Sequence, residues 1–169
     1  QYFLSSASVQ FAVRDFEKTY GPRWDMLPDK VMFQVNDTHP GLAIPELMRV
    51  LIDEKGLGWD EAEAITRRCF AYTNHTVMQE ALAGRMVSML IPRIYMILQE
   101  MNRRLCADLW NHFPGDWNRI AQMAILAYNQ VHMANLCVST CCMVNGVSQI
   151  HAEILRKQTF RDYCQLNPS

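Results

Sequence analysis

The sequence lacks an excess of charge of either sign, and it lacks any apolar run long enough to cross a bilayer. Lysine and arginine together number 16, aspartate and glutamate number 17, and the formal net charge is -1. A nearly neutral chain has little electrostatic attraction for nucleic acid or anionic lipid, so neither is expected as a partner. The longest apolar run, residues 86–98, contains Pro92 and Arg93 and is too short for a transmembrane helix.

The sequence also lacks the short motifs that mark several common enzyme classes. It contains no glycine-rich dinucleotide fingerprint, no P-loop and no nucleophile elbow. Its four lysines are Lys18, Lys30, Lys55 and Lys157. None stands in the Gly- and Ser-rich setting that suits a Schiff base with a phosphorylated cofactor. The chemistry of this protein must therefore be sought in other residues.

Six cysteines are present, and their surroundings indicate reduced, buried thiols. They are Cys69, Cys106, Cys137, Cys141, Cys142 and Cys164. They lie in apolar runs without paired C-x-x-C spacing, and no secretory leader opens the chain, which predicts a cytoplasmic protein. His132 with Cys137, Cys141 and Cys142 leaves a metal site as an alternative. Free cysteine is commonly buried as a small hydrophobic residue, so no metal is expected.

Half of the 169 residues are apolar and a fifth are charged, which suits a globular domain with a real core. The chain begins at Gln1 rather than Met and ends at 167–169 without a capping signal. We therefore expect a piece of a longer polypeptide.

Hydrophobic periodicity predicts an α/β chain that is mostly helical. The spacing predicts helices over 1–20, 45–54, 59–70, 79–90, 93–110 and 147–156, with a strand over 31–35. Glycine and proline predict a loop over 21–29 and a break at 114–115, Asn145-Gly146 predicts a turn, and the region around Asn74 and His75 is expected to be a loop. Asp60 is a candidate cap for the helix over 59–70.

Two polar stretches, 36–39 and 74–76, interrupt the apolar runs where a strand or helix should end. Polar side chains at element ends on an apolar scaffold are typical of ligand sites. Local chemistry alone favours turns, because Asn and Asp close turns through their own backbone. Asp37 and Glu80 could also form a glycosidase carboxylate pair, but their sequence spacing does not fix their distance in space.

Several strings in these regions resemble the α-glucan phosphorylases, which act on glycogen, starch and maltodextrin. They are LPDKV (27–31), NDTHP (36–40), LAIPELMR (42–49), AYTNHTV (71–77), EAL (80–82), PR (92–93), NRR (102–104), MANLC (133–137), VNGV (144–147) and IH (150–151). The match keeps its order over almost the whole chain. The resemblance implies a fragment of an enzyme several times longer.

The resemblance implies two Rossmann-like domains of the GT-B type with an active site between them. Residues 1–143 would end the N-terminal domain and 144–169 would begin the C-terminal, cofactor-binding domain. The pyridoxal phosphate of the family is bound through a lysine that would lie beyond Ser169, so no cofactor-binding residue is expected here. The parent enzyme would be a homodimer.

The resemblance also implies the reaction and the site residues. The family transfers a glucosyl unit from α-1,4-glucan to orthophosphate and releases α-D-glucose 1-phosphate. His75 would be the catalytic contact, through its backbone carbonyl, and Asn145 would bind the glucose 6-hydroxyl. Asp37 and His39 would line the pocket, largely through waters, and Thr76 would support the same loop.

The sequence departs from the family pattern at three places. Residues 83–86 replace the family's acidic and Trp-Pro segment, 141–143 replace a Ser-His or Ser-Tyr segment, and Asn135 stands where animal members carry His. The alternative reading is a stand-alone, non-catalytic domain that binds glucans or a protein. We expect the isolated chain to be inactive and to self-associate through an exposed apolar face.

Overall fold

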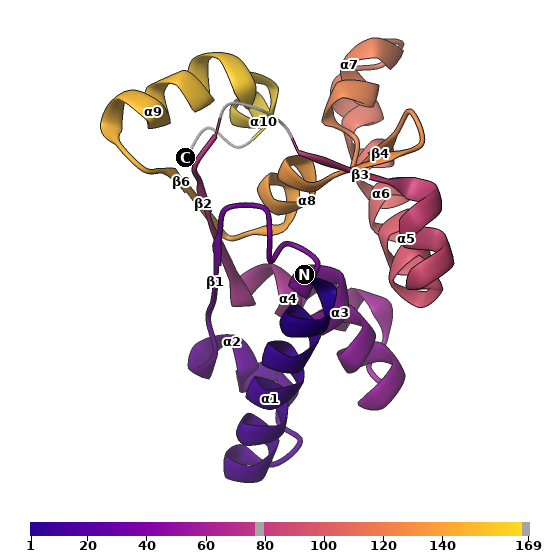
Figure 1. The fold of residues 1–169 in the computed structure, drawn as a ribbon, viewed down its shortest axis with the longest axis vertical. Helices are drawn as coiled ribbons and strands as arrows, with labels where there is room; N and C mark the ends of the chain where they lie inside the picture. The colour runs from indigo at the N-terminus through magenta and orange to yellow at the C-terminus, as the bar shows by residue number, and fades with distance from the viewer. Residues whose placement is uncertain (77–79, 167–169) are drawn as a thin grey trace.

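The computed structural model describes residues 1–76 and 80–166. Its helices are α1 (Tyr2–Tyr20), α2 (Leu27–Lys30), α3 (Ala43–Arg49), α4 (Trp59–Cys69), α5 (Gly84–Leu90), α6 (Pro92–His112), α7 (Trp117–Met123), α8 (Met133–Thr140), α9 (Gln149–Ile154) and α10 (Arg161–Leu166). A 3₁₀ turn covers Trp24–Met26, and π-helical turns cover Val50–Glu54 and Leu155–Thr159. In Figure 1, α1 to α4 form the lower half of the view, α5 to α7 the upper right, and α9 and α10 the upper left.

A three-stranded parallel sheet joins segments that are far apart in the sequence. Its order is β1 (Phe33–Asn36), β2 (Phe70–Asn74) and β6 (Met143–Gly146), with β2 in the centre. The residues at 70–72 of β2 are buried, as expected for a strand covered on both faces in a parallel sheet. The sheet therefore fixes the relative positions of the two polar stretches that follow β1 and β2.

A second, antiparallel sheet has the order β3 (Ala81–Ala83), β5 (Gln130–His132) and β4 (Leu126–Ala127). β4 and β5 form a hairpin whose two loop residues, Tyr128 and Asn129, have φ values of 52° and 58°. Two consecutive positive φ values are the signature of a type I′ turn, which matches the twist of the flanking strands. In the sequence, β3 lies between the second polar stretch and α5.

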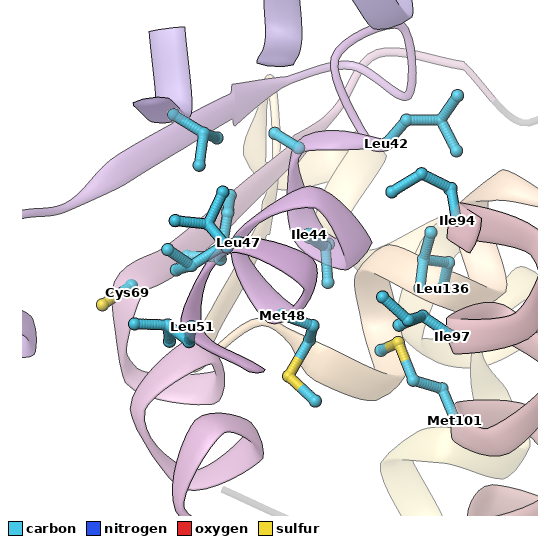
Figure 2. Packing of buried hydrophobic residues seen from close by; sticks show 14 of the residues in the cluster. Leu42, Ile44, Leu47, Met48, Leu51, Cys69, Ile94, Ile97, Met101 and Leu136 are labelled. Atoms are coloured by element: carbon cyan, nitrogen blue, oxygen red, sulfur yellow. The ribbon is translucent and has the colours of Figure 1, made fainter. Parts of the chain in front are cut away.

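The main hydrophobic core is centred on α3. Figure 2 shows Leu47 lying toward Cys69 of α4, and Met48 lying toward Ile97 and Met101 of α6. α3 also packs against α1, so three helices surround it, which explains why nearly every side chain in it is inaccessible. A smaller cluster joins α6 and α7 to the C-terminal helices; it consists of Leu109, Ile120, Met123, Ala134, Leu155, Phe160 and Tyr163.

Several sequence predictions are confirmed. α1, α4 and α6 occupy the helices expected over 1–20, 59–70 and 93–110, and β1 lies two residues beyond the start of the expected strand. The helix expected over 45–54 begins at Ala43 and continues through the π-helical turn. Pro45 lies in its first turn, where a backbone N–H has no intrahelical acceptor.

Other predictions are wrong. Phe70–Asn74 is the central strand β2, where no strand was expected, so the loop predicted around Asn74 and His75 begins only at His75. Ala81–Ala83 is a strand, because it pairs with β5, and only α5 remains of the helix expected over 79–90. Residue 79 and Val77 of the resembling string lie outside the described residues.

Three smaller expectations also fail. The expected loop over 21–29 contains α2 and a 3₁₀ turn. Gly58, not Asp60, occupies the N-cap position of α4. The Asp60 carboxylate instead lies 2.6 Å from the Arg104 guanidinium. Asn145 and Gly146 end strand β6 instead of forming a turn, because pairing with β2 extends their backbone.

Candidate functional site

The carboxyl ends of β1, β2 and β6 meet at one edge of the parallel sheet. β1 ends at Asn36 and is followed by the first polar stretch, while β2 ends at Asn74 and is followed by the second. β6 ends at Gly146, directly after Asn145. All five predicted site residues therefore lie at the same edge, which is where open α/β sheets commonly bind their ligands.

One row of polar side chains crosses the sheet near this edge. Asn36, Thr73 and Asn145 stand opposite one another on the three strands. The Thr73 hydroxyl accepts a hydrogen bond from Gln34 Nε2 at 2.9 Å and donates one to Asn145 Oδ1 at 2.8 Å. Asn145 is exposed, so this row holds an accessible amide in a defined orientation.

His75 is exposed at the end of β2, and its ring is held by the neighbouring strand. Its Nε2 lies 2.5 Å from the side-chain oxygen of Asn36. This contact ties the imidazole of His75 to the end of β1. Asn36 was not among the predicted site residues, although it opens the first polar stretch.

Asp37 forms a tight turn directly after β1. Its φ of 63° is in the left-handed region, which Asn and Asp adopt more readily than other side chains. Its backbone N–H donates to the Thr73 carbonyl at 2.9 Å, and its Oδ1 accepts from the Thr38 N–H at 2.8 Å. The expectation of a turn is confirmed, and the same turn presents the carboxylate at the sheet edge.

His39 lies between two carboxylates. Its Nε2 is 3.7 Å from Asp37 Oδ2, and its Nδ1 is 3.7 Å from Glu80 Oε2. Glu80 Oε2 also accepts a 2.7 Å hydrogen bond from the Thr38 hydroxyl. Asp37 and Glu80 are thus linked through one exposed imidazole, a proximity that their sequence spacing could not reveal.

Two of the residues that depart from the family pattern make hydrogen bonds that join elements of the fold. Asn135 is buried, and its Nδ2 donates to the carbonyls of Gln122 and Ala124 at 2.8 and 2.9 Å. It therefore fixes the end of α7. Cys142 donates its S–H to the Phe70 carbonyl at 3.1 Å, which ties the start of β6 to β2.

A cavity of about 550 Å³ lies beside Asn145 between β6 and the C-terminal helices. Cys141 and Cys142 are among its lining residues, together with Arg156. Burial raises the pKa of the Cys141 thiol to about 12 and raises that of Cys137 well above its usual value. Since thiolates are the reactive and metal-ligating form, these two cysteines are poor nucleophiles and poor ligands.

No group of three or more His, Cys, Asp or Glu side chains in 1–76 and 80–166 is arranged to hold a metal ion. Over the same residues, no helix has the length and apolar character needed to cross a membrane.

Three of the four lysines have charged or aromatic partners within the chain. Lys55 is paired with Glu17 at 2.5 Å, Lys157 is paired with Glu153 at 3.0 Å, and Lys30 lies over the Tyr20 ring. Lys18 is exposed in the last turn of α1.

The fold and site define an α/β protein with polar side chains gathered at the carboxyl edge of a parallel sheet. The model of the carbohydrate phosphorylase family matches residues 1–169, and the chain belongs to that family. It is 45% identical over 172 residues to a glycogen phosphorylase of Bacillus subtilis and 44% identical over 180 residues to an α-glucan phosphorylase, H isozyme, of Solanum tuberosum. It is 42% identical over 181 residues to the muscle glycogen phosphorylase of Mus musculus.

These alignments cover 99% to 100% of this chain but only 21% to 22% of each relative. The chain thus spans about a fifth of the length of the curated relatives it matches. Neither the relatives nor the geometry favours the alternative of a stand-alone binding domain.

Proposed function

We propose that this chain is part of an α-glucan phosphorylase that transfers a glucosyl unit from α-1,4-glucan to orthophosphate and releases α-D-glucose 1-phosphate. The observation that carries this proposal is the meeting of Asp37, His75 and Asn145 at one sheet edge. The chain is also 45% identical over its full length to a glycogen phosphorylase. In the parent, residues 1–143 end the first domain of a two-domain GT-B enzyme and 144–169 begin the second.

In this proposal, the backbone carbonyl of His75 faces the reacting centre. Positive charge develops on the sugar in an oxocarbenium-like transition state. A fixed dipole aimed at that charge stabilises the transition state more than the substrate. The ring contact between His75 and Asn36 supports this role, because it restrains the residue that carries the carbonyl.

The other residues bind and orient the sugar. Asn145 hydrogen-bonds the glucose 6-hydroxyl, and its contact with Thr73 sets the orientation of its amide. Asp37 and His39 line the pocket and contact the substrate largely through water. Thr76 supports the same turn, where its N–H is already bonded to the side chain of Asn74.

The remaining requirements are assigned to the rest of the parent protein. Pyridoxal phosphate, which supplies the phosphate group for acid–base catalysis when bound, is held outside this chain. We place the parent in the cytoplasm as a homodimer. The free state of all six cysteines supports a reducing compartment.

The test is the product formed by the complete protein that carries this sequence. Incubated with glycogen and orthophosphate, it should release α-D-glucose 1-phosphate, which ³¹P NMR can follow, whereas the 169-residue chain alone should release none.

Asn145→Ala should lower kcat/KM by about 10- to 100-fold, because a hydrogen bond to the substrate is lost. Ile150→Ala, at an exposed position outside the site, is the control and should match wild type. Release of glucose instead of its phosphate would overturn the proposal.

A further inference from the structure

Asn74, the last residue of β2, is buried and makes three side-chain hydrogen bonds. Its Nδ2 donates to the Tyr72 hydroxyl at 2.7 Å, and its Oδ1 accepts from the Thr76 N–H at 3.0 Å. The same Oδ1 lies 3.0 Å from His151 Nε2. Because a backbone N–H can only donate, the bond from Thr76 fixes which end of the amide is the oxygen.

The orientation of this amide determines the tautomer of His151. Asn74 Oδ1 only accepts, so His151 Nε2 carries a proton and donates it. His151 is the third residue of α9, where its backbone N–H donates to the Ser148 hydroxyl at 3.2 Å. The cap at the start of α9 thus sets the position from which the ring reaches β2.

Gly146 allows this ring to cross the end of β6. It stands opposite Asn74 in the sheet. A Cβ atom at Gly146 would lie 2.7 Å from His151 Cδ2 and 2.9 Å from the backbone nitrogen of Ala152. Any side chain there would displace the ring or the first turn of α9.

His75 lies between Asn74 and Thr76, which are joined by a hydrogen bond from the Thr76 N–H to the Asn74 side chain. The Asn74 side chain bonds the N–H two residues later, so it spans His75 and limits rotation of the peptide groups on both sides. The ring of His75 is held separately by Asn36. The Asn74 side chain therefore restrains the turn that carries the His75 carbonyl, and His151 is one of the two side chains that hold the Asn74 amide.

We propose that Asn74 and His151 are positioning residues that hold the His75 carbonyl in its productive direction. This inference rests on the proposed function, in which that carbonyl stabilises the transition state. A dipole contributes to catalysis only when it is already oriented before the reaction occurs. Loss of the His151 bond leaves the substrate contacts in place but frees the turn, so kcat should fall more than substrate affinity.

The first test uses NMR on the complete protein, ¹⁵N-labelled at histidine and threonine. In its neutral form the imidazole of His151 should carry its proton on Nε2 and none on Nδ1, without averaging between tautomers. His151→Ala should shift the Thr76 amide resonance, whereas His151→Gln, which keeps an N–H donor, should largely preserve it. A tautomer-averaged His151, or a Thr76 amide that does not respond to His151→Ala, would overturn the inference whatever the enzyme does.

The second test measures phosphorolysis by the complete protein. His151→Ala should lower kcat on the order of 100-fold with KM for glucan nearly unchanged, and His151→Gln should recover most of the rate. His112→Ala, an exposed histidine of α6, is the matched control and should behave as wild type. Equal losses for His151→Ala and His151→Gln, or a loss confined to KM, would contradict a positioning role. A wild-type protein without phosphorolysis would overturn the proposed function and the catalytic role of the pair, while the NMR result would still report the hydrogen bond.

Discussion

At the scale of single residues, Glu46 shows how a buried charge is held in this chain. Its carboxylate is fully buried in α3 and accepts hydrogen bonds from Tyr2, Ser6 and Arg49 at 2.7 to 2.9 Å. Burial is the largest single influence and would raise the pKa of Glu46, but the bonds from Arg49, Tyr2 and Ser6 together hold it below its usual value. The same contacts tie α1 to α3.

Glu46→Gln should lower the free energy of unfolding by about 3 kcal/mol at pH 7, because a buried ion pair loses one partner. The pKa of Glu46 is lower in the folded chain, so its contribution is present above the unfolded value of about 4.3 and is lost as pH falls through the folded value. The difference between wild type and variant should therefore shrink at acidic pH.

Urea unfolding at pH 7 and at pH 3 measures this difference. Glu61→Gln, at an exposed position of α4, is the control and should change stability by less than about 0.5 kcal/mol at either pH. A difference for Glu46→Gln that is the same at both pH values would show that the ionised carboxylate is not the stabilising group.

At the scale of elements, β2 shows why sequence analysis can miss a central strand. Its apolar residues 70–72 follow α4 without glycine or proline between them. A short apolar run cannot be distinguished from a buried helical segment by periodicity alone. The pairing of β2 with β1 on one side and β6 on the other makes this segment a strand.

The packing between α3 and α6 predicts which side chains of α6 stabilise the folded chain. Ile97 is fully buried in the contact drawn in Figure 2, while its neighbour Met96 is 57% exposed. Ile97→Ala should lower the free energy of unfolding by about 2–5 kcal/mol, because it removes buried methyl groups and leaves a cavity. Met96→Ala should change it by less than about 0.5 kcal/mol, since Ala is a good helix former and little buried surface is lost.

Thermal and urea unfolding of the two variants, followed by circular dichroism, gives both values on one helix. Comparable losses for Ile97→Ala and Met96→Ala would mean that another surface covers Met96 in solution.

At the scale of the whole molecule, a large apolar surface remains uncovered. Phe3 and Phe11 of α1 are 80% and 74% exposed, and Leu4 beside them is 70% exposed. Phe11 lies two helical turns after Phe3 and Leu4, and the exposed Ala7 lies between them on the same side, so the strip is continuous and apolar. Exposed patches of this kind are typical of surfaces that associate with other protein.

The isolated chain should therefore self-associate through the face formed by Phe3, Leu4 and Phe11. Sedimentation velocity should show a mass above that of the 19.6 kDa monomer that rises with concentration. Replacing Phe3 and Phe11 by Ser should shift the distribution toward monomer without lowering stability, because neither side chain is buried. A wild-type chain that stays monomeric at high concentration would contradict the expectation.

The sequence by itself determined the family and the long amphipathic helices. Family strings are contiguous, and the periodicity that marks α1 and α6 repeats within a few turns of one helix. It also indicated that polar residues at 36–39 and 74–76 stand at element ends. These features depend on residues close together in the chain, so no knowledge of the fold was needed.

Only the tertiary structure decided which of these residues meet. Strand order and register bring His151 to Asn74, 77 residues earlier, and place His39 between Asp37 and Glu80. The same pairing made strands of Phe70–Asn74 and Ala81–Ala83. Hydrogen bonds across a sheet depend on partners supplied by distant segments, and a linear sequence does not specify which partner arrives at a given strand.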